Sequence, residues 1–274
     1  MDSYNRLEHF TKFFSTKPPS SANTRVDIVV VSYNSLDYLK KCLESLEQYA
    51  DYPYALYVVD NASTDGSREF LKTLTTVTVI LADANQGYAK ACNQGARAGT
   101  GSYILFLNAD SEAAPNFLRP MVRCFESDPH IAVVGPKLVN FENKIVGAGV
   151  VGTNATPRLQ GWMEPDGPDK YSRQMDCLSM CGAAYMIRRD LIPRLGLFDE
   201  HYFFYYEETD YSYNARKNGY RVVYCPGSRM YHAVAGSSHD STPEQLRALF
   251  MNSERYFQQK WSDFLKEETL YGDQ

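Results

Sequence analysis

Apolar runs and helical periodicities alternate along the first half of the chain. Residues 26–32 form a nearly continuous β-branched run, which is typical of a strand covered on both faces. Four leucines between positions 36 and 46 recur at helical spacing, which predicts an amphipathic helix. The alternation continues, with strands expected at 55–59, 77–81, 103–107 and 131–134, and with helices capped by Ser67, spanning 87–98 and beginning at Pro115.

This alternation predicts an α/β domain built on a mostly parallel central sheet, because right-handed crossovers place helices on both faces of such a sheet. We expect a leader or linker at residues 1–25, the domain at 26–240 and a helical tail at 241–274. The tail is amphipathic from Pro243 to Trp261, which predicts a helix that docks back on the domain. Contact of this helix with a membrane, or with a second copy in a homodimer, is the alternative.

Polar side chains follow each of the first four expected strands. The carboxyl ends of parallel strands share one edge of a sheet, and ligands of such folds bind there. One polar loop would be an ordinary turn, but four in succession are better evidence for a binding site. The candidates are Ser32, Tyr33 and Asn34 after the first strand, Asp60, Asn61 and Ser63 after the second, Asn85, Gly87 and Tyr88 after the third, and Asn108, Ala109 and Asp110 after the fourth.

The chemistry of these loops favours a nucleotide ligand. Asp60 can accept hydrogen bonds from a ribose or a base amide, although alone it could equally be a turn acceptor, and Tyr33 can stack on a base. No Gly-x-Gly-x-x-Gly motif follows the first strand, which argues against a dinucleotide enzyme. Asp110 together with substrate oxygens can hold Mg²⁺ or Mn²⁺, because phosphates supply most of the ligands that such cations need.

Composition narrows the function classes. Hydrophobic residues make up 44% and charged residues 22%, which is ordinary for a globular protein. The net charge of -5 argues against nucleic acid as a partner, because binding to its phosphates needs a basic face. The six cysteines show no paired zinc spacing, so we expect reduced thiols. There is no signal-peptide core and no apolar run near the ~20 residues that span a bilayer, so we expect a cytoplasmic location, with the inner face of the cell membrane as an option.

Several longer motifs occur along the chain in a specific order. They are Val30 to Asn34, Val59 to Ser67, Asn85 to Gly95, Leu107 to Asp110, Gly196 to Glu200, and Phe204 to Tyr211, followed by Pro226 and His232. In combination they resemble the GT-A glycosyltransferases of family 2, especially the branch that contains bacterial rhamnosyltransferases. The resemblance covers about residues 26–261. It implies a Rossmann-like GT-A fold, with a nucleotide-binding half at 26–110 and an acceptor-binding half at 111–240.

The resemblance also implies an activity. A sugar would pass, with inversion, from a dTDP- or UDP-linked donor to a hydroxyl of a saccharide or lipid-linked saccharide, in the synthesis of bacterial surface polysaccharide. The implied roles fall on residues that match the family motifs: Asp60 on the base or ribose, Asn85, Gly87 and Asn93 along the diphosphate and sugar, Asp110 and His232 on a divalent metal, and Glu208 as catalytic base.

The sequence departs from the family pattern at two positions. Asn108 stands where many members have aspartate, and Glu208 stands where the base is commonly aspartate. Glu207 or Asp210 could therefore share or take the proton, and crowding the three acids raises their proton affinity. An acidic helix start is the alternative interpretation, because carboxylates suit the positive end of a helix.

Two aromatic residues, Trp162 and Tyr206, are candidates for acceptor binding, although Trp162 could equally anchor a loop. The rival functions are a non-catalytic carbohydrate-binding or scaffold protein and a sugar-nucleotide nucleotidyltransferase. The second would want a Gly-rich basic loop after the first strand, where the chain has Ser32, Tyr33 and Asn34. The acids and the histidine of the family motif are present in this chain, which argues against a non-catalytic carbohydrate-binding or scaffold protein.

Overall fold

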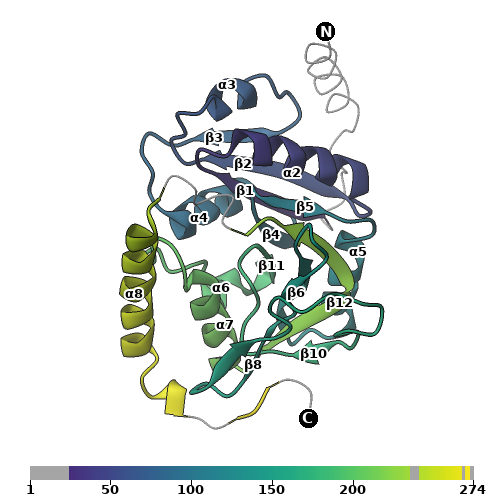
Figure 1. Cartoon of the computed structure of the whole chain (residues 1–274), viewed down its shortest axis with the longest axis vertical. Helices are drawn as coiled ribbons and strands as arrows, with labels where there is room; N and C mark the ends of the chain where they lie inside the picture. The colour runs from purple at the N-terminus through teal and green to yellow at the C-terminus, as the bar shows by residue number, and fades with distance from the viewer. Residues whose placement is uncertain (1–24, 235–240, 267–268, 272–274) are drawn as a thin grey trace.

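The computed structural model of the chain describes residues 25–234, 241–266 and 269–271, so the expected leader lies outside it except for Arg25. A central sheet with helices on both faces forms the described part (Figure 1). Its main strands are β1 Val26–Ser32, β2 Tyr54–Asp60, β3 Thr78–Leu81, β4 Tyr103–Asn108, β6 Ile131–Val139, β10 Met175–Asp176, β11 Ala184–Arg188 and β12 Arg221–His232. They follow the order β10-β12-β6-β11-β4-β1-β2-β3.

Most of these strands run in the same direction. β1 pairs in parallel with β2 and with β4, and β2 pairs in parallel with β3. β6 and β12 are also parallel, whereas β11 is antiparallel to both of its neighbours. The predicted mostly parallel sheet is confirmed. Short antiparallel strands complete the fold: β5 Ser111–Ala113 beside β12, β7 Ile145–Gly147 beside β6, and the pair β8 Val150–Gly152 and β9 Pro157–Leu159.

Helices cover both faces of the sheet because each buries an apolar side against it. On one face lie α2 Leu36–Tyr49, α3 Ser67–Leu71 and α5 Leu118–Ser127. On the other face lie α4 Tyr88–Ala98, α6 Ile192–Leu195, α7 Glu207–Lys217 and α8 Pro243–Lys260. Short 3-10 turns span Arg189–Leu191 and Phe264–Lys266.

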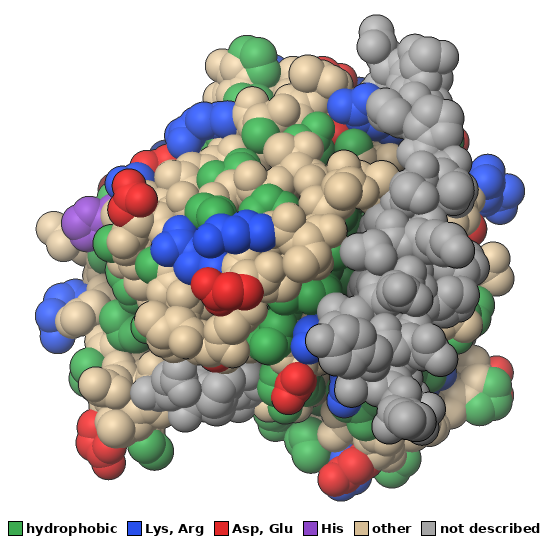
Figure 2. All heavy atoms as spheres, turned by 90° about the horizontal axis from the view of Figure 1, so that it is seen from above, with side chains coloured by type: hydrophobic (Ala, Val, Ile, Leu, Met, Phe, Trp, Pro, Cys, Tyr) green, Lys and Arg blue, Asp and Glu red, His purple; other side chains and the backbone are tan. Residues whose placement is uncertain are grey.

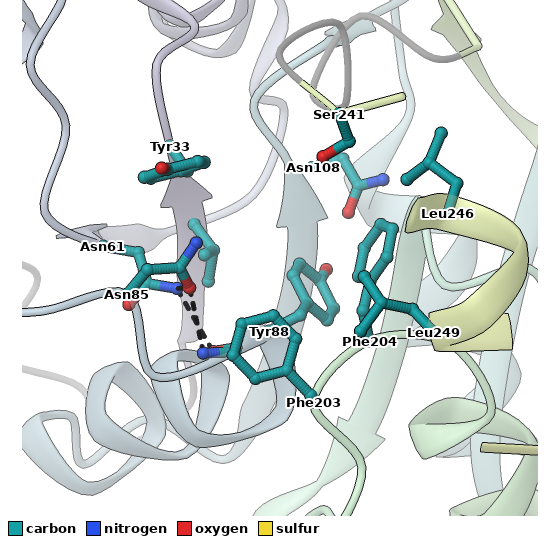
Figure 3. Close-up of a pocket in the computed structure, with 12 residues that line it drawn as sticks. Tyr33, Asn61, Asn85, Tyr88, Asn108, Phe203, Phe204, Ser241, Leu246 and Leu249 are labelled. Atoms are coloured by element: carbon teal, nitrogen blue, oxygen red, sulfur yellow. Dashed lines mark hydrogen bonds between the residues drawn. The ribbon is translucent and has the colours of Figure 1, made fainter. Parts of the chain in front are cut away.

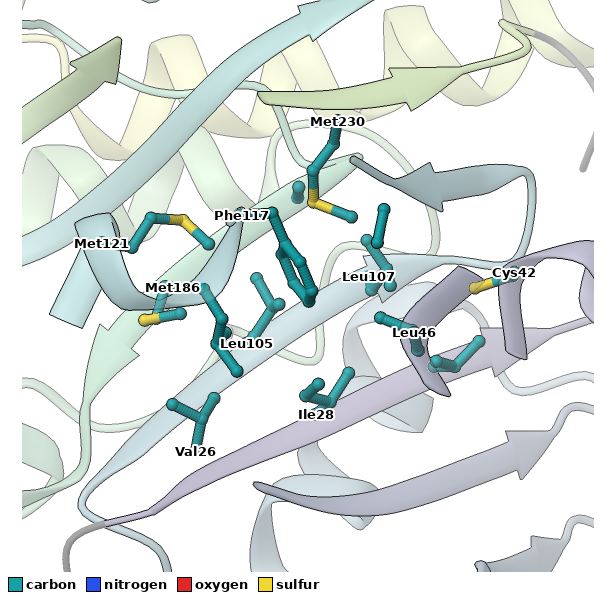
Figure 4. Close-up of a cluster of buried hydrophobic side chains, with 14 of the residues drawn as sticks. Val26, Ile28, Cys42, Leu46, Leu105, Leu107, Phe117, Met121, Met186 and Met230 are labelled. Carbon is teal, nitrogen blue, oxygen red and sulfur yellow. The ribbon is translucent and has the colours of Figure 1, made fainter. Parts of the chain in front are cut away.

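The core of the first face gathers around Phe117, which is fully buried with Leu105, Leu107 and Met230 (Figure 4). Residues from β1, β4, β11, β12 and α2 meet there, although they are far apart in the sequence. Burial of this apolar surface stabilises the fold by about 25 cal/mol per Å².

The start of α3 differs from the prediction. Ser67 is the first residue of the helix rather than its cap, and the cap position is held by Gly66 with φ 92°. Asp65 Oδ1 accepts the Ser67 N–H at 3.1 Å. The expected cap is therefore wrong by one residue, because a left-handed glycine at position 66 leads the chain into the helix.

The start of α5 also differs. The helix begins at Leu118, not at Pro115. Asp51 Oδ1 accepts the backbone N–H groups of Leu118 and Arg119, both at 3.0 Å. A carboxylate from a distant loop thus satisfies the first donors of this helix, which no local capping signal could reveal.

The tail helix α8 docks on the domain through its C-terminal half, as predicted. Thr242 caps it, accepting the N–H of Gln245 at 3.2 Å and donating to the Gln245 side chain at 2.8 Å. Phe257 and Trp261 are buried, whereas the first half of the helix has no buried residue. The first half has partly exposed contacts instead, such as that of Phe250 with Tyr206.

The described surface fits the composition. Basic and acidic side chains are interspersed over the face seen in Figure 2. Within the described residues, no helix has both the length and the apolar character that crossing a bilayer requires. All six cysteines are free thiols.

Candidate functional site

The strand-end loops lie side by side at one edge of the sheet. In the parallel register Ser32 lies opposite Asp60, and Val31 lies opposite Asn108. Asp60 in turn pairs with Leu81 at the end of β3. The loops that follow these four strands therefore start from one edge, as the alternation predicted.

Hydrogen bonds tie these loops together. The Asn34 N–H donates to Ser63 Oγ at 2.9 Å, and Asn34 Oδ1 accepts the Thr64 N–H at 2.8 Å. The Asn61 amide donates to Asn85 Oδ1 at 2.8 Å (Figure 3). Three loops from three strands thus form one hydrogen-bonded polar rim.

Asp60 lies beneath this rim and is fully buried. Its Oδ2 accepts the Ser63 N–H at 3.2 Å and lies 3.1 Å from Arg68 Nε. Its Oδ1 has no hydrogen-bond partner among the described residues. Ser32 is also buried, where its hydroxyl pairs with that of Ser35 at 3.1 Å. One acceptor of Asp60 therefore has no donor within the described part of the chain.

A pocket opens above the rim with a polar and an apolar side (Figure 3). Leu246 and Leu249 of α8 face the polar rim across this pocket, together with the ring of Phe204. The sequence analysis missed this apolar wall. The helical spacing of the two leucines was visible, but only the tertiary structure shows what they cover. The lining residues are Val31, Tyr33, Asn61, Asn85, Gly87, Tyr88, Asn108, Phe203, Phe204, Ser241, Leu246 and Leu249.

Asp110 and His232 meet just beyond the end of β4. Pairing of β5 with β12 sets His232 opposite Ser111, and the Ala233 N–H donates to the Asp110 carbonyl at 3.0 Å. His232 Nε2 then lies 3.4 Å from Asp110 Oδ1. The Asp110 side chain is buried, and neither of its carboxylate oxygens has a hydrogen-bond partner among the described residues. Ala109, between Asn108 and this carboxylate, is fully buried.

These two side chains fit a hard divalent cation. A buried carboxylate without hydrogen-bond donors is strongly destabilised unless a cation compensates its charge, and an imidazole nitrogen is a good second ligand. No group of three or more acidic, histidine or cysteine side chains in the described part of the chain is arranged to hold a metal ion. Substrate oxygens would therefore complete the shell.

Glu208 lies on the first turn of α7, against Gly182 in the loop before β11. A Cβ built on Gly182 would approach Glu208 Cδ to 3.4 Å. That loop also contacts the end of β4, since the Asn108 N–H donates to the Ala183 carbonyl at 3.1 Å. Burial, followed by the charges of nearby acids that include Glu208 and Asp110, raises the pKa of the Cys181 thiol to about 12. Both carboxylates thus lie near the same segment.

Glu207 and Glu208 are protonated more readily than ordinary glutamates. Burial raises the pKa of Glu207 well above its usual value, and the charge of Glu208 raises it further. Burial also raises the pKa of Glu208.

Asp210 has a different environment. Its carboxylate accepts the Tyr202 hydroxyl at 3.0 Å, the Trp261 indole N–H at 2.8 Å and the Lys260 ammonium at 2.9 Å. These partners hold α8 on α7. Asp210 is therefore committed to docking the tail, and the expectation that it could take the proton does not fit the structure.

Replacing Asp210 by Asn is accordingly expected to lower the free energy of unfolding by about 1–3 kcal/mol, because the half-exposed Lys260 then keeps only Asp199 as a carboxylate partner and the buried site loses one of its acceptors. Urea denaturation would measure this loss. Asp263→Asn is the matched control, because Asp263 pairs with Lys266 at the exposed surface. Equal stability of the two variants would refute the docking role.

Asn93 does not line the pocket. Its amide donates to the Phe198 carbonyl at 2.8 Å and to Glu200 at 3.0 Å, and it accepts the Phe198 N–H at 3.1 Å. It therefore fixes the loop before α7 rather than facing a ligand. Gly87 does line the pocket, and its φ of 86° and the Phe203 carbonyl, 2.5 Å from a built Cβ, leave room only for glycine.

Trp162 and Tyr206, the two candidates for acceptor binding, lie in different parts of the structure. Trp162 is 51% exposed, in the connection between β9 and β10 and outside the pocket lining. Tyr206 has φ 72° at the start of α7 and packs against Phe250 and Phe257 of α8. Its hydroxyl donates to Glu254 at 3.4 Å. Tyr206 therefore belongs to the docking of α8, and its candidacy as an acceptor contact is not supported by its position.

Solved structures share this architecture. Mannosyltransferase PcManGT from Pyrobaculum calidifontis, in complex with GDP-Man and Mn²⁺, aligns with a TM-score of 0.60 and 20% identity, over 97% of this chain and 72% of that one. GalNAc-T7 with UDP, GalNAc and Mn²⁺ aligns with a TM-score of 0.70 and 20% identity, over 89% of this chain. The match covers 49% of the GalNAc-T7 chain, so this protein spans about half of its length. The fold is therefore GT-A, as expected.

Sequence relatives agree. An N-acetylglucosaminyl-diphospho-decaprenol L-rhamnosyltransferase of Mycobacterium tuberculosis is 23% identical over 248 residues, which are 81% of this chain and 80% of the relative. O-antigen biosynthesis protein RfbC of Myxococcus xanthus is 26% identical over 245 residues, which are 84% of this chain and 19% of that protein. Residues 27–195, more than half of the chain, match the family model described as Glycosyl transferase family 2. The chain therefore belongs to glycosyl transferase family 2, where it resembles the rhamnosyltransferase branch.

Proposed function

We propose that this glycosyltransferase moves a sugar from a dTDP- or UDP-linked donor to a hydroxyl of a saccharide or lipid-linked saccharide, with inversion and with a divalent cation. The observation that carries the proposal is the meeting of Asp110 and His232 just after Asn108, which lines the pocket, with Glu208 against the neighbouring loop. A nucleotide alone would not require a buried carboxylate that lacks donors. A transfer reaction also needs a general base, and Glu208 lies against the same loop before β11.

The polar rim would hold the nucleotide. Tyr33, which lines the pocket together with Asn61 and Asn85, would stack on the base. The free acceptor of Asp60 would take a hydrogen bond from the base or the ribose. Asn108, at the end of β4, faces the pocket between the rim and the apolar wall.

Asp110 and His232 would hold Mg²⁺ or Mn²⁺, which stabilises the negative charge that develops on a departing diphosphate. Both solved neighbours described above contain Mn²⁺. Glu208 would accept the proton of the incoming hydroxyl on the side of the sugar opposite the diphosphate, which gives inversion in one displacement.

The acceptor is proposed from the relatives. Their names include a diphospho-decaprenol acceptor and O-antigen biosynthesis, which supports a lipid-linked saccharide and a place in surface polysaccharide synthesis. We place the reaction in the cytoplasm, at the inner face of the cell membrane. Phe250 and Met251 of α8 are 41% and 45% exposed and would provide peripheral contact with the membrane or with a second copy. Vesicle flotation and analytical ultracentrifugation separate these two outcomes.

A donor screen tests the proposed function. The protein is incubated with UDP-, dTDP- and GDP-sugars, with Mn²⁺ or Mg²⁺ and with EDTA, and released nucleoside diphosphate is measured by mass spectrometry. We expect release from a dTDP- or UDP-sugar and its loss in EDTA. No release with any donor, together with no thermal shift by dTDP or UDP, would favour the carbohydrate-binding alternative.

A further inference from the structure

A second pocket lies between the strands β6 and β12 and the loops near positions 143 and 166. Among the described residues, none that lines it also lines the pocket at the polar rim. Its volume is about 460 Å³, which is within the usual range of small-molecule sites. The polar side chains that line it are Lys137, Asn143, Asp166 and Arg229. The roles assigned above to the polar rim and the metal site use none of these residues.

Two cations in this pocket share a single carboxylate. Lys137 Nζ lies 3.1 Å from Asp166 Oδ1, and Arg229 Nη1 lies 3.0 Å from Asp166 Oδ2. The side chains of Lys137 and Asp166 are only 9% and 4% exposed. The pocket lining thus has one positive charge in excess, although the whole chain has a net charge of -5. A buried cation that has to share its counter-charge in this way favours the binding of an anion.

One donor of Arg229 has no partner among the described residues. Its Nη2 donates to Asn143 Oδ1 at 2.7 Å, and its Nη1 faces Asp166. Its Nε is buried and lacks an acceptor within the described part of the chain. A buried N–H group without an acceptor is costly, and the planar fork of a guanidinium matches the oxygens of a phosphate. The chemistry of the pocket therefore fits a phosphate group.

The two cations lie on the same face of the sheet as α7. Lys137 and Arg229 are opposite each other in the parallel pairing of β6 with β12. Leu138 and Met230, which follow them, belong to the core of the first face, so the alternation of strand side chains directs both cations to the other face. There α7 packs against both strands and carries Glu208. The pocket and the proposed base thus share one side of the sheet.

Strand β12 connects this pocket with the candidate metal site. Arg229 and His232 are separated by about 10 Å of strand, at the usual rise of about 3.3 Å per residue. The ring of Tyr231, which precedes His232, lies 5.4 Å from Arg229 Cζ and stacks on the ring of Phe141 at 5.7 Å. Phe141 is 56% exposed. A saccharide can span this interval, with an aromatic surface beside it.

We propose that Lys137 and Arg229 bind a phosphate group of the acceptor, while the acceptor hydroxyl that reacts lies at Glu208. The proposal rests on the proposed function, because it takes Glu208 and His232 as the place of transfer. A saccharide that is joined to a lipid through phosphate carries this group at one end. Holding that end in the pocket would determine which hydroxyl of the saccharide reaches the base.

Binding of phosphate probes tests the pocket without any transfer. Calorimetric titration in EDTA, which leaves no cation at the metal site, measures the affinity for farnesyl diphosphate, N-acetylglucosamine 1-phosphate and inorganic phosphate. We expect Arg229→Gln to weaken binding of the two organic phosphates at least about tenfold, because a charge-assisted hydrogen bond is lost. Arg173→Gln is the matched control, because Arg173 is exposed and lies outside the pocket lining.

Asp166→Asn tests the charge of the pocket in the opposite direction. Without this carboxylate both cations lack a counter-charge, so we expect the organic phosphates to bind at least about threefold more tightly. If the ion pairs served only to hold the loop at Asp166, binding in this variant would be unchanged or weaker, and that result would overturn the proposal. Equal affinity of wild type and Arg229→Gln would overturn it as well. Inorganic phosphate that binds as tightly as the organic probes would assign the pocket to a free anion and not to the acceptor.

The phosphate pocket and the proposed function can fail separately. If the protein transfers sugar, Arg229→Gln should raise the KM of a lipid-linked acceptor at least about tenfold and leave the KM of the donor near the wild-type value. Probes that bind the wild type more tightly than Arg229→Gln, in a protein that releases no nucleoside diphosphate, would leave the phosphate pocket and remove the proposed function. Transfer by a wild type that binds none of the probes would leave the function and remove the pocket.

Discussion

Replacing Glu208 by Gln is expected to lower the kcat of sugar transfer by about 10²- to 10⁴-fold, the usual contribution of a general base. The amide matches the carboxylate in shape but cannot accept the proton of the acceptor hydroxyl. Donor affinity should stay near the wild-type value, because the polar rim of Asn61 and Asn85 is untouched. Initial rates of transfer and calorimetric titration with the nucleotide measure the two effects.

Glu126→Gln is the matched control for this experiment, because Glu126 is exposed on α5 and belongs to the other face of the sheet. Full activity of Glu208→Gln would remove Glu208 as the base. Glu207 would then be the next candidate, since Asp210 is paired with Lys260.

The pH profile follows from the burial of Glu208. Because burial raises its pKa, the protonated, inactive form persists to a higher pH than for an exposed glutamate. Activity is thus expected to fall as pH decreases, with the acid limb of kcat above about pH 4.5. A limb at or below this value would show that the base is a solvent-exposed acid.

Replacing Asp110 by Ala is expected to lower kcat/KM by at least about 10²-fold, because the cation that stabilises the departing diphosphate loses its carboxylate. Metal should also cease to strengthen nucleotide binding in this variant. Calorimetric titration of UDP or dTDP, with Mn²⁺ and with EDTA, measures this coupling. His232→Ala should change it in the same direction.

Asp169→Asn is the matched control, because Asp169 is an exposed carboxylate outside the pocket lining. The metal site would be refuted if nucleotide affinity in the wild type were the same with EDTA as with Mn²⁺. It would also be refuted if Asp110→Ala kept the difference.

Much of the fold could be predicted because its signals are local. The buried run of β1 and the leucine spacing of α2 appear in the structure as strand Val26–Ser32 and helix Leu36–Tyr49. The starts of helices were less certain. Asp51 caps α5 from a loop more than sixty positions away, and such a contact has no local signature.

The sequence predicted at which edge of the sheet the candidate site lies. Parallel strands must end together, so the loops after β1, β2 and β4 had to meet once the sheet was recognised. The approach of His232 to Asp110 was expected only from the family resemblance. The structure supplies a physical cause, the antiparallel pairing of β12 with β5.

The sequence by itself determined the order of strands and helices, the polar rim and the set of acids at the start of α7, because periodicity and turn chemistry act between near neighbours. Only the tertiary structure decided which acids are engaged. Lys260 and Trp261 fold back over Asp210, whereas Glu207 and Glu208 receive no cation from the described residues. The apolar wall of Leu246 and Leu249 was settled in the same way. Burial and partners depend on contacts between distant segments, and those contacts fix both the charge of an acid and what a pocket can hold.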